Sequence, residues 1–234
     1  IGFNFDLDGD FDGLEVAKDL SAYVIGGRLQ AITTGSDPVL TNDIDDFNAD
    51  PIEALLVRIK SDQAGALQFF WSTTDSTGFS GTRSVSTNLA GTNQWQTVRL
   101  LLRGNAEWNG KTITNLRLDP INQSGANIEI DAIALSSGDA DSDTLPDAYE
   151  DAKGLDALLT SDAAGDLDQD GFSSLDEYIA GTSPNDSSDR FVATGIYTAG
   201  AAFQVEVDRK PRFGIDMAVF YKKEGANRLS NNDP

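Results

Sequence analysis

The 234-residue sequence contains no cysteine and no histidine. Without cysteine no disulfide can form, so any extracellular stability has to come from core packing or from bound ions. Without histidine, Ser–His and Cys–His nucleophilic catalysis and histidine-ligated zinc sites are excluded. No stretch approaches the ~18 consecutive apolar residues that a membrane-spanning helix requires, so no membrane span is expected.

Basic residues are also scarce, because 17 Lys and Arg stand against 38 Asp and Glu and leave a formal net charge of −21. A field this negative repels phosphate, so nucleic acid is not an expected partner. The acids comprise 30 Asp and only 8 Glu. General surface solvation would use both types, so the excess of short carboxylates favours loops that converge on a hard cation such as Ca²⁺.

Residues 1–138 contain short runs with strand character, separated by Gly, Asn, Asp, Ser or Thr. Leu55, Val57 and Ile59 alternate with other residues, which indicates a strand with one buried face. A series of seven or eight such strands without an amphipathic helix predicts a mainly β fold, an antiparallel β-sandwich of the jelly-roll type. The predicted strands are Tyr23–Thr34, Ile52–Lys60, Ala66–Thr74, Arg83–Leu89, Trp95–Arg103, Ile113–Ile121 and Asn127–Leu135.

The last of these strands changes its alternation. Ile128 and Ile130 share one parity, whereas Ile133 and Leu135 have the other. A β-bulge at Asp131–Ala132 would return all four side chains to one buried face and re-aim the Asp131 side chain. The alternative is an ordinary irregularity at a sheet edge.

Residues 139–189 hold 15 acidic residues against a single base, Lys153. Like charges so crowded keep a segment unfolded unless cations neutralise them. From Asp139, the segment follows the EF-hand order of carboxylates at positions 1, 3 and 5, a carbonyl at 7, often a water at 9 and a bidentate Glu at 12. The predicted ligands are Asp139, Asp141, Asp143, the Leu145 carbonyl, Asp147 and Glu150. Thr144 replaces the usual Gly at position 6, so distortion of this loop is expected.

The same order recurs 27 residues later, with Gly171 at position 6 and a complete match to D-x-[DN]-x-[DN]-G-x₅-E. Its predicted ligands are Asp166, Asp168, Asp170, the Phe172 carbonyl, Ser174 and Glu177, and additional candidates are Asp156, Asp162 and Asp186. A solvated acidic linker, the alternative, would rarely contain two such loops in tandem. Each loop is expected to lead into a short helix, with Pro146 near the first start and Gly154 and Gly181 at the C-terminal stops.

The run D-A-D-S-D-T-L-P-D-A-Y-E, followed by G-L-D, D-L-D-Q-D-G-F-S-S-L-D-E-Y-I-A-G-T-S-P and N-D, resembles bacterial thrombospondin type 3 repeats over about residues 139–189. The resemblance implies a calcium-stabilised spacer between domains of a large secreted or cell-surface bacterial protein. Dockerins share the duplicated loop, but their second helix is longer, and the G-T-S-P stop argues against them.

The first domain, residues 1–138, also has a family resemblance, over about residues 1–136. F-D-L-D-G-D-F-D-G-L-E, G-S-D-P, W-N-G-K-T-I-T-N-L-R-L-D-P and I-E-I-D-A-I-A-L resemble a jelly-roll module attached to secreted bacterial polysaccharide-degrading enzymes. The resemblance implies a non-catalytic, carbohydrate-binding role. It also implies a structural Ca²⁺ where the first strand meets the last, with the candidate ligands Asp6, Asp8, Asp10, Asp12 and Asp131.

Sugar binding requires flat aromatic faces with polar groups beside them. Trp95 leads an apolar strand and Trp108 lies in the W-N-G-K-T-I motif, so both are expected to be structural. The candidate ligand-binding residues are therefore Phe70, Trp71 and Phe79. Arg117 and Asp119 are expected to pair with each other rather than to touch a ligand.

A glycosidase needs two carboxylates about 5–10 Å apart, one of them with a raised pKa. The most suggestive carboxylates are assigned to the calcium loops, so the chain is not expected to be an enzyme. Residues 190–234 return to alternation at Phe203, Val205 and Val207, with a second apolar run at Met217–Tyr221. Two or three strands are too few to close a sandwich, so residues 190–234 are predicted to form an incomplete β unit that a neighbouring copy could complete.

Two interpretations follow. In the first, the chain is a non-catalytic, extracellular, calcium-binding protein whose jelly roll binds a glycan and serves adhesion, with a calcium-stiffened spacer behind it. In the second, it is a self-assembling structural subunit of an extracellular filament or surface layer, joined to copies of itself by strand exchange through residues 190–234.

Overall fold

A computed structural model describes residues 2–199 and 202–207 of the chain. The chain divides into two compact units, Ile1–Ala140 and Asp141–Pro234, which are described separately. Residues 208–234, including the predicted apolar run Met217–Tyr221, lie outside the described residues.

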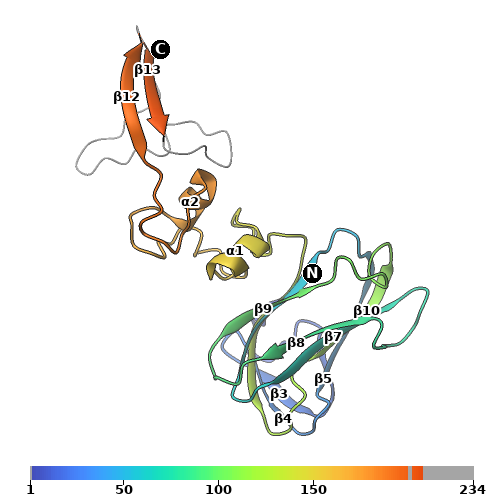
Figure 1. The fold of residues 1–234 in the computed structure, drawn as a ribbon. Helices are drawn as coiled ribbons and strands as arrows, with labels where there is room; N and C mark the ends of the chain where they lie inside the picture. Colours follow the sequence, from blue (N-terminus) through green and yellow to red (C-terminus); the bar gives the residue numbers. More distant parts are fainter. Residues whose placement is uncertain (1, 200–201, 208–234) are drawn as a thin grey trace. The chain divides into compact units, whose positions relative to one another are not determined.

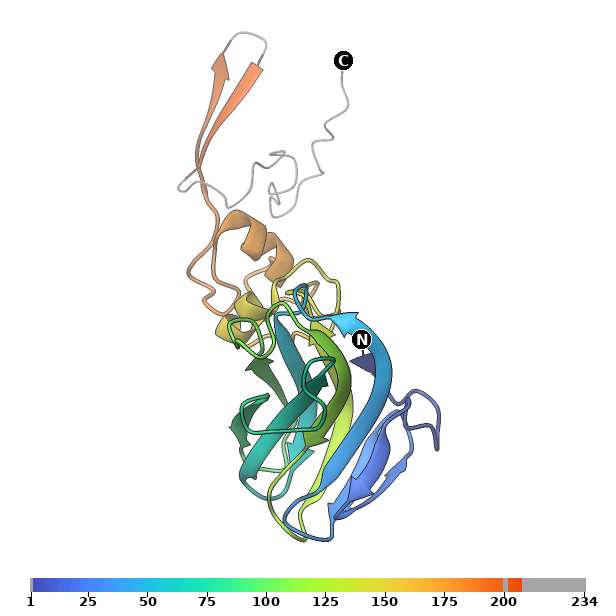
Figure 2. The ribbon, with the colours of Figure 1, turned by 90° about the vertical axis from the view of Figure 1, so that its right-hand side faces the viewer.

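The first unit is an antiparallel β-sandwich, as predicted, and two views at right angles show its strands in two layers (Figures 1 and 2). One sheet has the order β3-β4-β11-β6-β9, with β1 paired to β11, and the other has the order β2-β5-β10-β7-β8. The strands are β1 (Gly2–Phe3), β2 (Glu15–Lys18), β3 (Leu20–Val24), β4 (Leu29–Thr33), β5 (Val39–Asn48), β6 (Ala54–Ser61), β7 (Gly65–Thr73), β8 (Ser84–Leu89), β9 (Gln96–Leu101), β10 (Thr112–Asp119) and β11 (Asn127–Ser136).

The core lies between the two sheets and takes side chains from every strand of the sandwich except β2, whose four residues are exposed. On β6, Leu55, Val57 and Ile59 are buried at the predicted parity. Trp71 and Trp108 meet edge to face in this core, with their ring centroids 5.1 Å apart. Each indole N–H is satisfied there, because Trp71 Nε1 donates to the Glu107 carbonyl and Trp108 Nε1 donates to the Ile52 carbonyl. The expectation that Trp108 is structural is confirmed.

Two features of the strand prediction differ from the structure. The predicted strand Tyr23–Thr34 is a hairpin of β3 and β4, because Gly26 and Gly27 both adopt positive φ, at 61° and 73°, and reverse the chain. β1, β2 and β5 were not predicted. Of these, β5 is the longest, and it lies between β2 and β10 in its sheet. Its sequence, V-L-T-N-D-I-D-D-F-N, carries three Asp residues that obscure the apolar alternation.

The bulge predicted in the last strand is present. The register of β11 against β6 shifts between Ile130 and Ala132. On either side of the shift, Ile128, Ile130, Ile133 and Leu135 all face the core. β4 pairs with β11 before the bulge and β1 pairs with the same edge after it, so the extra residue separates two strand partners.

The second unit contains two short helices, α1 (Asp147–Lys153) and α2 (Ser174–Ala180), and a hairpin of β12 (Ala193–Ala199) and β13 (Ala202–Val207) (Figure 1). The predicted helix ends are confirmed: Pro146 is the N-cap of α1, and Gly154 and Gly181 are C-caps with left-handed φ of 77° and 80°. The tyrosine rings of the two helices touch, with the centroids of Tyr149 and Tyr178 4.6 Å apart. Among the described residues no helix is long and apolar enough to cross a membrane.

Candidate functional sites

The two acidic loops share one backbone conformation. In the first, the Asp143 N–H donates to Asp141 Oδ1 and the Leu145 N–H donates to Asp143 Oδ1. The second repeats both bonds at the matching positions, from Asp170 to Asp168 and from Phe172 to Asp170. Each of these aspartates thus gives one oxygen to the turn.

Thr144 does not distort the first loop in the way that its place at position 6 suggested. Its φ of 89° lies close to the 99° of Gly171 at the same position of the second loop. Position 4 also matches, since Ser142 and Gln169 have φ of 65° and 64°. A β-branched residue at positive φ costs on the order of 1 kcal/mol or more. The first loop therefore keeps the turn at the expense of local strain.

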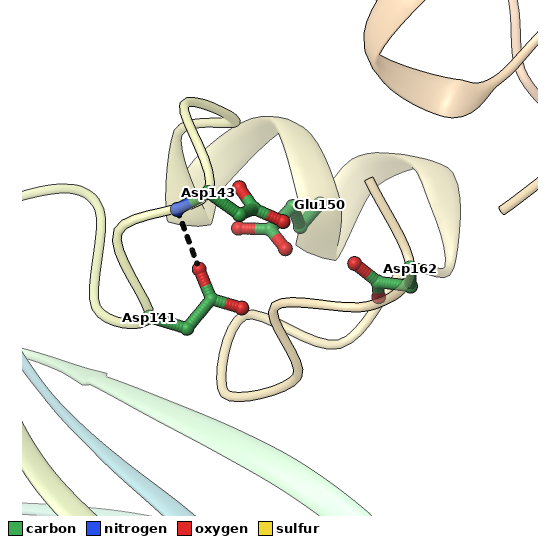
Figure 3. Close-up of side chains that lie close together, drawn as sticks. All are labelled: Asp141, Asp143, Glu150 and Asp162. Atoms are coloured by element: carbon green, nitrogen blue, oxygen red, sulfur yellow. Dashed lines mark hydrogen bonds between the residues drawn. The ribbon is translucent and has the colours of Figure 1, made fainter. Parts of the chain in front are cut away.

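Four carboxylates converge at the first loop. One oxygen from each of Asp141, Asp143, Glu150 and Asp162 lies within 4.8 Å of the others. Figure 3 shows Asp143 and Glu150 facing each other, with Asp141 below them and Asp162 entering from a separate turn of the chain. Glu150 comes from α1, so loop, helix and following turn each contribute to the cluster.

Glu150 carries the strongest signal in this cluster. Its side chain is fully buried, and neither carboxylate oxygen has a hydrogen-bond partner among the described residues. Burial, followed by the negative charges of Asp141 and Asp143, raises the pKa of Glu150 to about 9. A buried, unpartnered carboxylate beside three others is strongly unfavourable unless a cation compensates the charge. The donor set therefore fits a hard divalent cation.

The second loop brings together Asp166, Asp168 and Asp170 within the same distance limit. Asp168 Oδ2 and Asp170 Oδ2 are buried without a hydrogen-bond partner in the described part of the chain. Glu177 is 2% exposed, and its Oε1 accepts a bond from the Thr182 hydroxyl while Oε2 has no partner there. Burial, followed by the charges of the three aspartates, raises the pKa of Glu177 to about 7.

The remaining predicted ligands lie outside the two converging groups. Asp139 and Asp147 are not among the four carboxylates of the first group. The Ser174 hydroxyl donates to the Gly165 carbonyl, so it is already engaged in the turn before α2. The carbonyl roles of Leu145 and Phe172 stay predictions.

Of the three additional candidates, only Asp162 joins a group. Asp156 Oδ1 accepts from the Leu158 N–H, so this carboxylate caps its own turn. Asp186 is exposed and accepts from the Ser188 N–H and hydroxyl, and these bonds lower the pKa of Asp186. Sequence order alone did not distinguish the three, because each lies in a loop rich in Asp.

The five predicted N-terminal calcium ligands form no converging carboxylate group in the described part of the chain. Asp12 Oδ2 accepts from the N–H groups of Asn4 and Phe5, and Asp8 Oδ1 accepts from the Gly26 N–H. Asp10 Oδ1 accepts from the Asp12 N–H. Neither Asp6 nor any of these joins a converging group in the described chain. Asp131 lies at the bulge and forms ion pairs with Arg58 and Arg28 on the outer face of its sheet.

The prediction that Trp71 binds a glycan is wrong, because its side chain is fully buried. It has the parity of Leu67 and Phe69 on β7, and all three are buried. Phe70 therefore faces outward, and it is half-buried, as is Phe79 in the loop between β7 and β8. Sequence reasoning could have found this assignment from the alternation of β7.

Phe70 lies in a row that crosses its whole sheet. Strand register places Glu15, Thr41, Arg117, Phe70 and Ser84 opposite one another on neighbouring strands. The Arg117 guanidinium carbon lies 5.0 Å from the Phe70 ring centroid. The sheet thus presents an aromatic ring among polar side chains on its outer face.

The predicted pair of Arg117 and Asp119 is present and bidentate, at 2.6 and 2.7 Å. Arg117 also donates to Asp37 at 2.9 Å, and Asp37 in turn pairs with Lys18. Burial raises the pKa of Asp119, whereas the hydrogen bond from Lys18 lowers the pKa of Asp37. This network holds the guanidinium against the Phe70 ring.

Comparison with known proteins returned no matching family profile and no matching curated protein. Solved structures of family 29 carbohydrate-binding modules resemble the chain. One variant has 12% identity and a TM-score of 0.46 over 66% of this chain and 95% of its own. Another, in complex with mannohexaose, has 11% identity and a TM-score of 0.42 over 56% and 86%. Values this low leave the function of the chain to be argued from its own residues.

Proposed function

We propose that residues 139–189 bind Ca²⁺ and form a calcium-stabilised spacer of the thrombospondin type 3 kind. The observation that carries this proposal is Glu150, which is fully buried with two unpartnered oxygens beside three aspartates. Ca²⁺ takes six to eight oxygen ligands in flexible geometry, which suits a cluster of carboxylates better than the strict octahedron of Mg²⁺.

Each loop, with the glutamate of the helix that follows it, would supply ligands to one ion. Asp141, Asp143, Glu150 and Asp162 would hold the first ion, and Asp166, Asp168, Asp170 and Glu177 the second. The Asp-to-backbone bonds within each loop fix the carboxylates before the ion arrives. A preorganised donor set loses less entropy on binding.

The proposal predicts two opposite effects of Glu150→Gln. With a chelator present, the variant stabilises the segment at neutral pH, since the amide is neutral without taking up the proton that the raised pKa of Glu150 requires on folding. With Ca²⁺ present, the variant binds at least about tenfold more weakly, a loss of about 1.4 kcal/mol. Calorimetric titration of the full chain with Ca²⁺, alongside amide hydrogen exchange of α1, measures both.

Asp151→Asn is the matched control, because Asp151 is exposed on the same helix and this substitution also changes a carboxyl group into an amide. It should leave both quantities close to those of the unmodified chain. Equal Ca²⁺ affinity of the Glu150→Gln variant and the unmodified chain would refute the proposed site.

We infer that the sandwich is a non-catalytic carbohydrate-binding module, with the outer face around Phe70 as its binding surface. Support comes from the half-buried ring on an open sheet face, flanked by the Arg117 guanidinium. Aromatic rings beside charged hydrogen-bonding groups are the combination that sugar rings require. Together the two units would make a secreted or cell-surface module with a calcium-stiffened connection.

Native gel electrophoresis through soluble xyloglucan, glucomannan or galactan tests the glycan proposal. The unmodified chain should be retarded by at least one of these polysaccharides. Phe70→Ala should weaken that retardation about fivefold or more, a loss of about 1 kcal/mol of stacking. Leu7→Ala is the control, because Leu7 is an exposed apolar residue of the loop between β1 and β2 and belongs to neither sheet.

A further inference from the structure

The outer face of the other sheet carries a second row that the sites above do not use. Tyr23 lies opposite Gln30, Gln30 lies opposite Glu129, and Glu129 lies opposite Lys60. Core residues flank each of them along its strand, so all four side chains face outward. Continuing the register across β9 brings Trp95 to the far end of the row.

Neighbours in this row are in contact. The Tyr23 hydroxyl donates to Gln30 Oε1 at 3.0 Å, and Lys60 Nζ pairs with Glu129 Oε1 at 2.6 Å. Lys60 Nζ also lies 5.2 Å from the centroid of the Trp95 ring. The row therefore begins and ends in an aromatic side chain, with hydrogen-bonding groups between them. Four inter-strand spacings separate its ends, about 19 Å in all.

Trp95 differs from the other two tryptophans, because it is half-buried whereas Trp71 and Trp108 have no exposed surface. The guanidinium carbons of Arg28 and Arg58 lie 5.4 and 5.7 Å from its ring centroid, in addition to Lys60. Three cations on one ring hold the indole in place. A ring already held loses little side-chain entropy when a ligand stacks on it.

The charges around Trp95 largely cancel. Lys60 pairs with Glu129 and Arg58 with Asp131, and Arg28 lies 3.5 Å from Glu129 and 3.8 Å from Asp131. Distances this long leave guanidinium N–H groups of Arg28 for a ligand. The patch carries a single positive charge in a chain of net charge −21, whose field repels polyanions. The chemistry that fits is therefore the uncharged hydroxyl and C–H surface of a sugar.

We propose that this face is a second glycan-binding surface, on which an uncharged polysaccharide chain lies across the strands from Tyr23 to Trp95. The proposal rests on the carbohydrate-binding function proposed above and adds a surface on the opposite side of the sandwich. Sugar rings stack on the two aromatic ends, and Gln30, Glu129 and Arg28 bind hydroxyl groups between them.

Tryptophan fluorescence reports on this face directly. Since Trp71 and Trp108 are buried, acrylamide reaches mainly Trp95 in the folded chain. Saturation with a retarding polysaccharide should lower the slope of acrylamide quenching by about half or more, because a stacked ligand covers the ring. Polysaccharide binding that leaves the quenching slope unchanged would overturn the proposal.

Variants separate this face from the face around Phe70. Trp95→Ala and, independently, Tyr23→Ala should each weaken retardation by neutral polysaccharide about tenfold, as loss of an aromatic anchor does. Phe70→Ala should leave the protection of Trp95 from acrylamide intact. The Trp95→Ala and Tyr23→Ala variants could instead be retarded as strongly as the unmodified chain, while Phe70→Ala loses retardation. That result would refute the second surface and support the first.

Two further outcomes are informative. A chain that no polysaccharide retards, neutral or acidic, would refute the carbohydrate-binding function itself. Retardation by polygalacturonate alone, abolished by Trp95→Ala, would show that the occupant is anionic and would overturn the assignment of an uncharged ligand.

Discussion

At the scale of single residues, the most consequential feature is that Glu150 and Glu177 are buried at position 12 of their loops. Both pKa values lie above the ordinary value of 4.5, at about 9 and about 7. The main cause in each case is burial, and the neighbouring aspartates add to it. These groups make the metal-free segment sensitive to pH.

The direction of that sensitivity follows from linkage. A carboxyl group whose folded pKa exceeds its unfolded pKa binds its proton more tightly when folded. With a chelator present, the contribution of these two groups to the stability of the folded segment is therefore greatest below about pH 4.5. It is lost as the pH rises through about 7 for Glu177 and about 9 for Glu150. Hydrogen-exchange protection of α1 and α2, corrected for intrinsic rates, should fall from pH 5 to pH 8.

Glu150→Gln should flatten this pH dependence in α1, since the glutamine does not titrate. Saturating Ca²⁺ should reverse it, because protons compete with the ion for the same oxygens. A metal-free segment whose protection increases from pH 5 to pH 8 would contradict the burial of these two glutamates.

At the scale of elements, the turns decide how closely the strands of the sandwich approach. Gly91 follows β8, and a Cβ added there would lie 2.2 Å from the Ala64 nitrogen and 2.4 Å from the Gln63 carbon. Both atoms are backbone of the β6–β7 turn and cannot rotate away. The close approach of these two segments therefore requires glycine.

Gly91→Ala should destabilise the sandwich by about 1–3 kcal/mol, the usual cost of overpacking. Gly81→Ala is the matched control, since nothing lies within 4 Å of a Cβ added at Gly81. Urea unfolding followed by tryptophan fluorescence compares the two variants, and equal midpoints would contradict the close approach.

At the scale of the whole molecule, the two units have different sources of stability. The sandwich has a continuous apolar core, whereas the acidic segment has two seven-residue helices and clustered carboxylates. An ion that binds only the folded segment stabilises it by mass action, by about 2.7 kcal/mol at a hundredfold excess over Kd. All three tryptophans lie in the sandwich and report on that unit alone.

Chelation should therefore act on one unit only. With EDTA, endoproteinase Glu-C, which needs no metal, should cleave within residues 141–189, and excess Ca²⁺ should protect this segment. The melting transition followed by tryptophan fluorescence should stay unchanged by either treatment. Equal cleavage with and without Ca²⁺ would count against the calcium-stabilised spacer.

The sequence by itself determined the features whose partners lie close along the chain. The sandwich class follows from alternation at residues such as Leu55 and Val57, and the bulge follows from the parity change around Asp131. The helix ends at Gly154 and Gly181 were predictable because capping involves only neighbouring residues. In the same way, the loop spacing predicted that Asp141, Asp143 and Glu150 belong to one ligand group, since all three lie within ten residues of sequence.

Tertiary structure decided what depends on residues far apart in sequence. Asp162 enters the first carboxylate group from a separate turn, whereas Asp8 and Asp12 bind backbone N–H groups that no spacing rule identifies. Trp71 is buried and Trp95 is half-buried because packing across the two sheets, and not hydrophobicity, selects which ring faces the core. Local hydrogen bonding and alternation are set within a few residues, but the neighbours of a side chain across a sheet exist only once the strands have paired.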